Sequence, residues 1–139
     1  MSTTNANLIE KANQIIQLQA NASFGVIDEN GYPSVSAISL CNPETIATLY
    51  FTTTLDSNKA KRLTANSKAS INAFTDANNI TLVGKAEILT DQDSKNKYWK
   101  EWFCEVYAGP TDPNYCVIQF TTERVSLWIG EDGGEFPLA

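Results

Sequence analysis

The succession of strand-like segments along most of this chain constrains its fold more than any other feature. About seven stretches have the β-branched and aromatic content, or the alternation, of strands: 22–27, 33–40, 45–52, 68–75, 80–90, 115–120 and 123–129. Turn residues join most neighbours directly, and helical patterns interrupt the strands rather than alternating with them. This order predicts a mainly β fold, a closed or split antiparallel barrel, and not a parallel α/β sheet.

Short helical patterns flank these strands. Apolar residues at helical spacing predict an amphipathic helix over roughly residues 5–18, and shorter helices are expected over 56–65 and, with a heavy aromatic face, over 91–104. Gly84, in the middle of a long strand pattern, predicts a bulge or a close backbone approach. The acidic, glycine-rich segment 130–134 is expected to be frayed.

Length and charge limit the classes of partner. The 139 residues, 42% of them hydrophobic, predict a single domain over residues 1–139 with a core of its own. A net charge of −6 argues against nucleic acid or an anionic membrane surface as a partner. No stretch is apolar for long enough to span a bilayer, and no export signal is visible at the start. An anionic ligand would therefore need a local patch of positive potential.

Histidine is absent, and this excludes Ser-His-Asp and Cys-His catalysis and nearly every catalytic zinc arrangement. The three cysteines lack metal-ligand spacing, so no metal site is expected. Unpaired thiols favour a reducing, cytoplasmic location, with Cys41 as an exposed thiol at a strand end. Since no side chain stands out as a catalytic acid or base, a cofactor is the expected agent of any chemistry.

The junction between the third strand and the following helix is the strongest candidate site. Three hydroxyl residues end the strand, and Ser57 and Lys59 open the helix. A helix N-terminus presents unpaired N–H groups, so with Thr53, Ser57 and Lys59 it is suited to bind a phosphate. The alternative is a plain surface helix capped by Asp56 or Ser57.

Two groups of motifs occur in a specific order. The strand–hydroxyl–Ser-x-Lys segment is followed by Ala69–Phe74 and by Leu82-Val83-Gly84-Lys85-Ala86-Glu87. The second group consists of Tyr98-Trp99, Trp102-Phe103, Gly109-Pro110-x-Asp112-Pro113-x-Tyr115 and Trp128. The first group resembles the FMN-binding split barrel of pyridoxamine 5′-phosphate oxidase relatives, and the second is similar to their short general stress protein branch. The resemblance runs from about residue 8 to residue 129.

This resemblance implies a split antiparallel β-barrel of about six to seven strands with short flanking helices, working as a homodimer that holds FMN between its subunits. The strand Ala37–Leu40 would pass along the isoalloxazine ring. The implied contacts of the strand with the cofactor are Ala37, Ile38 and Ser39. Thr53, Ser57 and Lys59 match the residues that hold the phosphate, and Thr52 and Asn58 are further implied cofactor contacts. Asn79 would reach the ring from the other subunit, and Trp102 and Trp128 would form the dimer side of the pocket.

Departures from the oxidase pattern lower the expected affinity for FMN. Ala37 and Asn42 stand where the oxidase has basic residues, and Asn58 replaces another. Lys59 would then be the main cation, with Arg62 as a possible helper one turn on. The oxidase's arginine-containing C-terminal substrate segment has no counterpart, so pyridoxamine phosphate oxidase activity itself is not expected.

Three functions remain open at this point. The first is a small FMN-dependent oxidoreductase of unknown substrate, because the resemblance implies a flavin and no side chain competes with it for the chemistry. The second is a non-catalytic dimer that stores or senses flavin. The third is a structural dimer whose ligand site has decayed.

Overall fold

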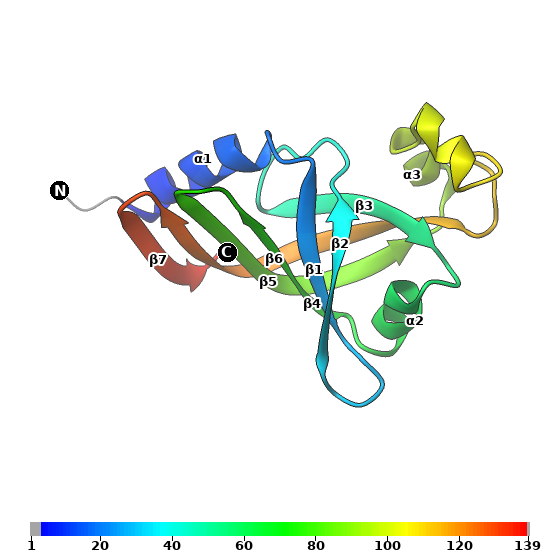
Figure 1. Ribbon diagram of the computed structural model, residues 1–139, viewed down its shortest axis with the longest axis horizontal. Coiled ribbons are helices and arrows are strands. Elements are labelled where there is room, and N and C mark those ends of the chain that lie inside the picture. Colours follow the sequence, from blue (N-terminus) through cyan, green and yellow to red (C-terminus); the bar gives the residue numbers. More distant parts are fainter. Residues whose placement is uncertain (1–3, 139) are drawn as a thin grey trace.

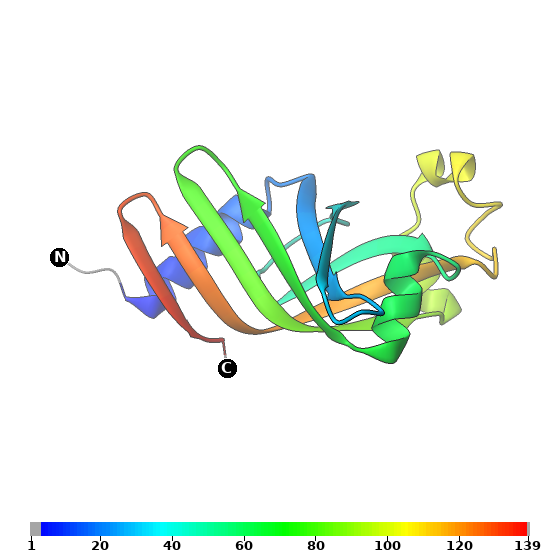
Figure 2. The same cartoon turned by 60° about the horizontal axis from the view of Figure 1, so that its bottom comes forward.

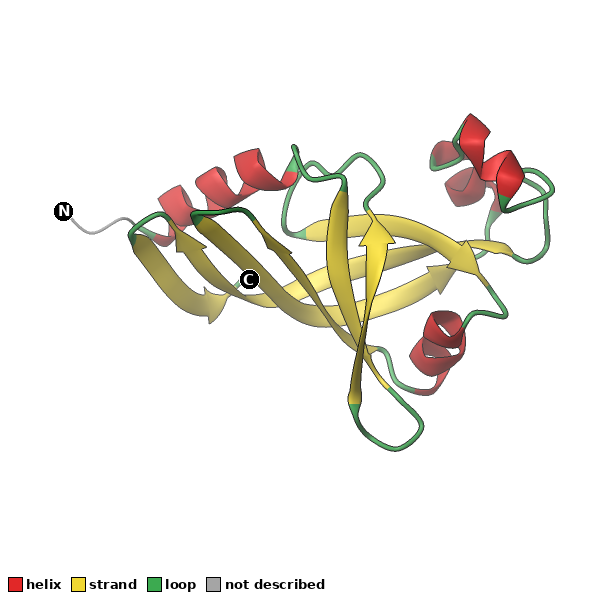
Figure 3. Ribbon diagram, viewed as in Figure 1, coloured by secondary structure: helices red, strands yellow, loops and turns green. Residues whose placement is uncertain are grey.

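Seven antiparallel strands form one strongly curved sheet in the computed structural model, which describes residues 4–138 (Figure 1). The strands are β1 (Asn21–Ile27), β2 (Pro33–Ser39), β3 (Thr48–Thr54), β4 (Lys68–Phe74), β5 (Asn78–Leu89), β6 (Tyr115–Ile129) and β7 (Asp132–Pro137). The helices are α1 (Asn5–Ile16), α2 (Asn58–Ala65), α3 (Gln92–Lys97) and the 3₁₀ helix η1 (Glu101–Glu105). The predicted mainly β fold with short flanking helices is confirmed, as the colours of Figure 3 show.

The strand order brings the two ends of the sheet together. It runs β2-β1-β4-β5-β6-β3, and β7 also pairs with β6. Because β6 has 15 residues, its first half pairs with β3 and its second half with β7. The curvature then brings β2 towards β3, where the Cys41 N–H donates to the Tyr50 carbonyl at 2.8 Å. The seam between these two strands is the split in the barrel.

Two apolar clusters support the fold. The larger one fills the barrel and includes Phe24 and Phe51, whose ring centroids lie 4.7 Å apart in an edge-to-face contact. The smaller one gathers aromatic rings from the segment after β5 and from the start of β6, with Tyr115 fully buried among them. The smaller cluster lies beside the β2–β3 seam, so it links the core to the site described below.

Gly84 combines both features that the sequence predicts for it. The register between β5 and β6 shifts at Val83/Gly84, so Glu123 is an extra residue on β6. A Cβ on Gly84 would also collide with the Thr121 carbonyl oxygen. Because the bulge absorbs the extra residue, the two expected strands 115–120 and 123–129 form one continuous β6, which corrects that prediction.

The acidic tail is not frayed as expected. Gly130 adopts a positive φ of 63°, a conformation open to glycine, and turns the chain back so that β7 pairs along β6. Figure 2 shows β7 beside β6, with α1 running across these strands. Contacts of α1 with β6 and β7 complete this end of the molecule.

The predicted helix over 91–104 is in fact two short helices. Asp91 caps α3 by accepting from the Ser94 N–H at 3.0 Å. Lys100 is extended between the two helices, and this break lets the aromatic side chains point in different directions. Tyr98 stacks on Tyr50, whereas Phe103 packs against the rest of the smaller cluster. One continuous helix face could not make both contacts.

None of the helices within residues 4–138 has both the length and the apolar content needed to cross a membrane.

Candidate functional site

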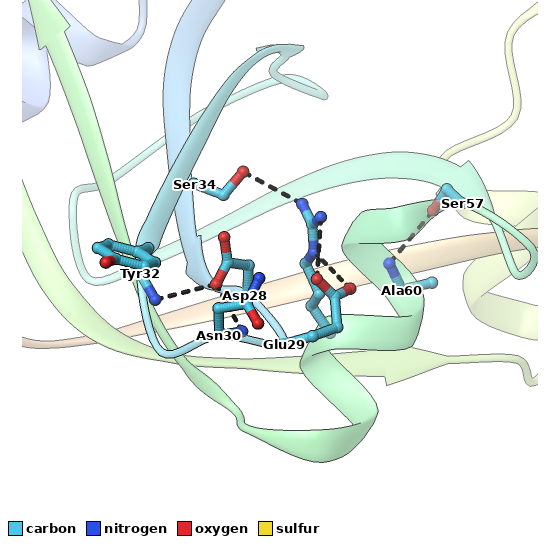
Figure 4. Close-up of polar contacts among 8 residues, drawn as sticks. Asp28, Glu29, Asn30, Tyr32, Ser34, Ser57 and Ala60 are labelled. Carbon is cyan, nitrogen blue, oxygen red and sulfur yellow. Dashed lines mark hydrogen bonds and ion pairs between the residues drawn. The ribbon is translucent and has the colours of Figure 1, made fainter.

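The N-terminus of α2 is ordered by a chain of hydroxyl groups. The Ser57 Oγ accepts from the Ala60 N–H at 3.2 Å, as Figure 4 shows, so Ser57 and not Asp56 is the N-cap. The Thr53 Oγ1 donates to the Ser57 Oγ at 3.1 Å. By helix geometry the N–H groups of Asn58 and Lys59 have no acceptor within the helix. Capping by Ser57 and binding of an anion use different N–H groups of the same helix end. The two interpretations of this junction are therefore compatible.

A cavity of about 200 Å³ opens at the β2–β3 seam, and we call it the seam pocket. Its walls come from the end of β2, from β3, from α2 and from the segment after α3. The lining residues are Ala37, Ile38, Ser39, Leu40, Cys41, Thr52, Thr53, Lys59, Lys100, Trp102, Phe103, Val106 and Tyr107. The fold thus brings together most of the predicted cofactor contacts, although they come from segments more than 60 residues apart in the sequence.

The seam pocket is positively charged in an acidic protein. Lys59 and Lys100 line it, both half-buried, and none of its described lining residues is acidic. Neither ammonium group has a hydrogen bond or ion pair with the described residues 4–138. Lys100 was missed from the sequence, because only the break between α3 and η1 brings it to the pocket. Its position two residues before the predicted Trp102 was the one available signal.

Arg62 does not serve as the helper expected from the sequence. Its guanidinium donates to Glu29 at 3.1 and 3.3 Å and to the Ser34 Oγ at 3.1 Å. Figure 4 shows Glu29 and Ser34, at the β1–β2 turn and the start of β2, facing α2. The hydrogen bond with Arg62 lowers the pKa of the Glu29 carboxyl, so this pair is charged at neutral pH. Arg62 therefore connects α2 to the hairpin formed by β1 and β2.

Two predicted contacts lie outside the seam pocket. Asn79 and Trp128 face each other in register across β5 and β6. The Asn79 Oδ1 accepts from the Asn72 Nδ2 at 2.8 Å, and the Trp128 ring lies over Gly133 while 55% of the residue stays exposed. Phe74, 69% exposed, is the next residue across the sheet. Phe74 and Trp128 are thus exposed on the same sheet, with the half-buried Asn79 between them.

The remaining predicted residues flank the pocket. Ser57 and Asn58 lie at the α2 N-terminus, with Ser57 half-buried and Asn58 exposed, and neither lines the cavity. Asn42 follows the end of β2 and has a positive φ of 43°. Neither Ala37 nor Asn42 supplies a charge, so the two lysines provide the positive potential here.

The Cys41 thiol and the Tyr107 phenol, the two uncharged side chains of the pocket that could lose a proton, stay protonated at neutral pH. Burial raises the pKa of the Cys41 thiol, with the nearby Lys100 acting in the opposite direction. Burial likewise raises the pKa of the Tyr107 phenol, whose hydroxyl lies 3.4 Å from the Thr52 Oγ1. Cys41 is 4% exposed, which corrects the expectation of an exposed thiol. Neither group is a ready general base.

A larger concave surface, about 580 Å³, lies over α2, β5 and β6. It contains none of the predicted contacts, and its charged side chains are Lys85, Glu87 and Glu123, of mixed sign. It also lacks a helix N-terminus, so the smaller seam pocket is the better anion site. Within residues 4–138 no group of three or more His, Cys, Asp or Glu side chains could hold a metal ion.

The curved sheet with a pocket at its open seam defines a split barrel. Residues 8–129 match the family model described as pyridoxamine 5′-phosphate oxidase, and the chain therefore belongs to that family. No curated protein matches the chain.

Solved structures agree with this assignment. A protein related to general stress protein 26 of B. subtilis, from Clostridium acetobutylicum, is 27% identical over 98% of this chain and 97% of its own, with a TM-score of 0.81. General stress protein 26 from Bacillus anthracis is 25% identical over 94% and 98%, with a TM-score of 0.80. A pyridoxamine 5′-phosphate oxidase-related, FMN binding protein from Nostoc punctiforme shares the fold, at 14% identity over 94% and 85% and a TM-score of 0.60. The predicted family and its general stress protein branch are confirmed.

Proposed function

We propose that this chain binds FMN in the seam pocket and acts as an FMN-dependent oxidoreductase of the general stress protein type. The observation that carries the proposal is the meeting of Lys59, the α2 N-terminus and the Thr53 hydroxyl at one end of an acid-free cavity. A phosphate there would receive backbone N–H groups and one full positive charge. The printed description of the Nostoc punctiforme relative as FMN binding supports the same ligand.

The open edge of β2 suits a flat heterocycle. β2 pairs with β1 along one edge, and its other edge faces the seam. An unpaired strand edge presents backbone N–H and C=O groups in alternation. The backbone of the segment Ala37–Ser39 can therefore pair with the donors and acceptors of an isoalloxazine ring without any charged side chain. The small, uncharged residue Ala37 is compatible with this role.

A second copy of the chain would complete the site. The cavity of about 200 Å³ is smaller than the roughly 300–1,000 Å³ of usual ligand pockets. Two apolar side chains at its mouth, Trp102 and Val106, are 56% and 60% exposed. We propose a homodimer in which Asn79 and the exposed Trp128 of one subunit border the seam pocket of the other.

Light scattering on the purified protein tests this dimer. The expected mass in solution is about twice the 15.3 kDa of one chain. Exchanging Trp128 for serine should shift the population towards monomer, whereas Tyr32→Ser, a similarly exposed aromatic at the β1–β2 turn, should not. A monomer at micromolar concentration would contradict the shared pocket.

The chain's own residues would bind, orient and shield the flavin. Bound FMN supplies hydride transfer at its N5 atom. Lys59 and Thr53 hold the phosphate end, and Phe103 and Tyr107 form a wall that excludes water. The protonated Cys41 and Tyr107 cannot abstract a proton at neutral pH. Pyridoxamine phosphate oxidase activity is not part of the proposal.

The same lack of a base favours a second candidate, a dimer that stores or senses flavin without turnover. Anaerobic mixing of the FMN-loaded protein with NADH or NADPH distinguishes the two. An oxidoreductase should bleach the flavin band at a rate on the order of 1 s⁻¹ or faster with one of these donors. Bound flavin that both donors reduce no faster than free FMN would favour storage or sensing.

The cysteines agree with a reducing compartment. Cys41 and Cys116 are free and buried. We propose a cytoplasmic location on this ground.

A further inference from the structure

A second groove shares a wall with the seam pocket. It has a volume of about 410 Å³ and lies between the α1–β1 connection and the chain just after β2. The residues common to both cavities are Ser39, Leu40, Lys100 and Trp102. A ligand in this groove, which we call the amide groove, would therefore lie next to the occupant of the seam pocket.

The amide groove is rich in hydrogen-bond donors and has no acidic side chain. The chain carries 16 acidic residues, yet the described lining contains none of them. Its polar side chains include four amides, Gln17, Gln19, Asn21 and Asn42. The Gln17 amide is held by donation to the Glu44 carbonyl at 2.9 Å, and the Asn21 Oδ1 accepts from Ser39 at 3.3 Å. The Asn21 amide nitrogen keeps its donors for a ligand.

Lys100 is the cation of this groove. It is half-buried, and its ammonium group has no acid or acceptor within residues 4–138. Lys59 sits beside the α2 N-terminus, where the proposed FMN phosphate is bound, and it does not line the amide groove. Lys59 thus lines the seam pocket alone, whereas Lys100 lines both cavities and is available to a second anion when Lys59 holds the phosphate.

We propose that the amide groove binds the second reactant of the flavin, a small planar molecule carrying one carboxylate that pairs with Lys100. One cation matches one negative charge, and the amide groove, unlike the seam pocket, has no α-helix N-terminus among its lining residues to stabilise the second charge of a phosphate dianion. The Trp102 indole, 56% exposed, offers an apolar face for the flat part of the ligand. The role as a reactant rests on the proposed function, but binding at the groove does not.

Benzoate and its neutral counterpart benzamide are suitable probes. Their dissociation constants are measured by ligand-observed NMR titration, on the protein both with and without FMN. Wild-type protein should bind benzoate at least about tenfold more tightly than benzamide. The Lys100→Gln variant should lose about ten- to a hundredfold in benzoate affinity and little in benzamide affinity. Lys97→Gln, with the same charge change on a neighbouring exposed lysine outside both cavities, should behave as wild type.

Each adverse outcome is distinct. Equal affinities for benzoate and benzamide, or equal effects of Lys100→Gln and Lys97→Gln, would overturn the proposal. A loss of FMN affinity in Lys100→Gln as large as that in Lys59→Gln would assign Lys100 to the flavin phosphate and also overturn it. Benzoate discrimination in a protein that does not bind FMN would support the groove while refuting the proposed function.

Discussion

The affinity for FMN is expected to fall about ten- to a hundredfold when Lys59 is replaced by alanine, whereas the affinity for riboflavin should change little. A charge-assisted hydrogen bond to an anion contributes about 1.5–3 kcal/mol, and riboflavin lacks the phosphate that would receive it. Lys59 faces the seam pocket and has no partner within residues 4–138. Its removal therefore leaves no buried acid unpaired. Flavin fluorescence quenching in parallel titrations with FMN and riboflavin gives both dissociation constants.

Lys61→Ala is the matched control for this experiment. Lys61 lies on the same helix, is exposed and does not line the pocket. It carries the same charge as Lys59, so any general electrostatic effect on FMN would appear in both variants. Equal losses of FMN and riboflavin affinity in Lys59→Ala would remove the lysine from the phosphate site.

Replacing Tyr115 by alanine is expected to lower the free energy of unfolding by about 3–5 kcal/mol, as for other large buried aromatics. The side chain is fully buried in the smaller cluster. Its ring lies 4.7 Å from that of Tyr107 and 5.4 Å from that of Trp99. Its hydroxyl donates to the Lys95 carbonyl at 2.7 Å. Urea denaturation followed by circular dichroism measures the loss.

Tyr115→Phe separates packing from hydrogen bonding. It keeps the ring but leaves the Lys95 carbonyl without this donor, at a cost of about 1–3 kcal/mol. FMN binding should survive in Tyr115→Phe. A loss below about 1 kcal/mol in Tyr115→Ala would show that this cluster does not support the domain, and the pocket wall built on it would need another source of rigidity.

Local patterns were sufficient to predict most of the fold. The alternation in 68–75 and the glycine at position 84 predict a half-buried strand and a bulge, and both are present. The tail was misjudged, because Gly-rich acidic composition describes a local preference, whereas β7 exists through its pairing with β6. The helix over 91–104 was misjudged for a related reason. The directions of Tyr98 and Phe103 are set by side chains from other parts of the fold against which they pack. Helical periodicity contains no information about those contacts.

The candidate site likewise contains residues that the local sequence could identify and residues whose positions depend on distant parts of the chain. Thr53 and Lys59 could be predicted, since the strand–helix junction that presents them is continuous in sequence. The role of Arg62 could not, because its partner Glu29 is 33 residues away. Lys100 depends on the break between α3 and η1, which no local signal predicts. The contributions of Asn79 and Trp128 remain predictions that depend on a second subunit.

The most direct test of flavin binding is the visible absorption spectrum of the purified protein after incubation with excess FMN and desalting. The spectrum should show a flavin band with about equimolar FMN retained per chain, and Lys59→Ala treated in the same way should lose most of it. A colourless wild-type protein would contradict FMN binding at the seam pocket, and would favour a structural dimer whose ligand site has decayed.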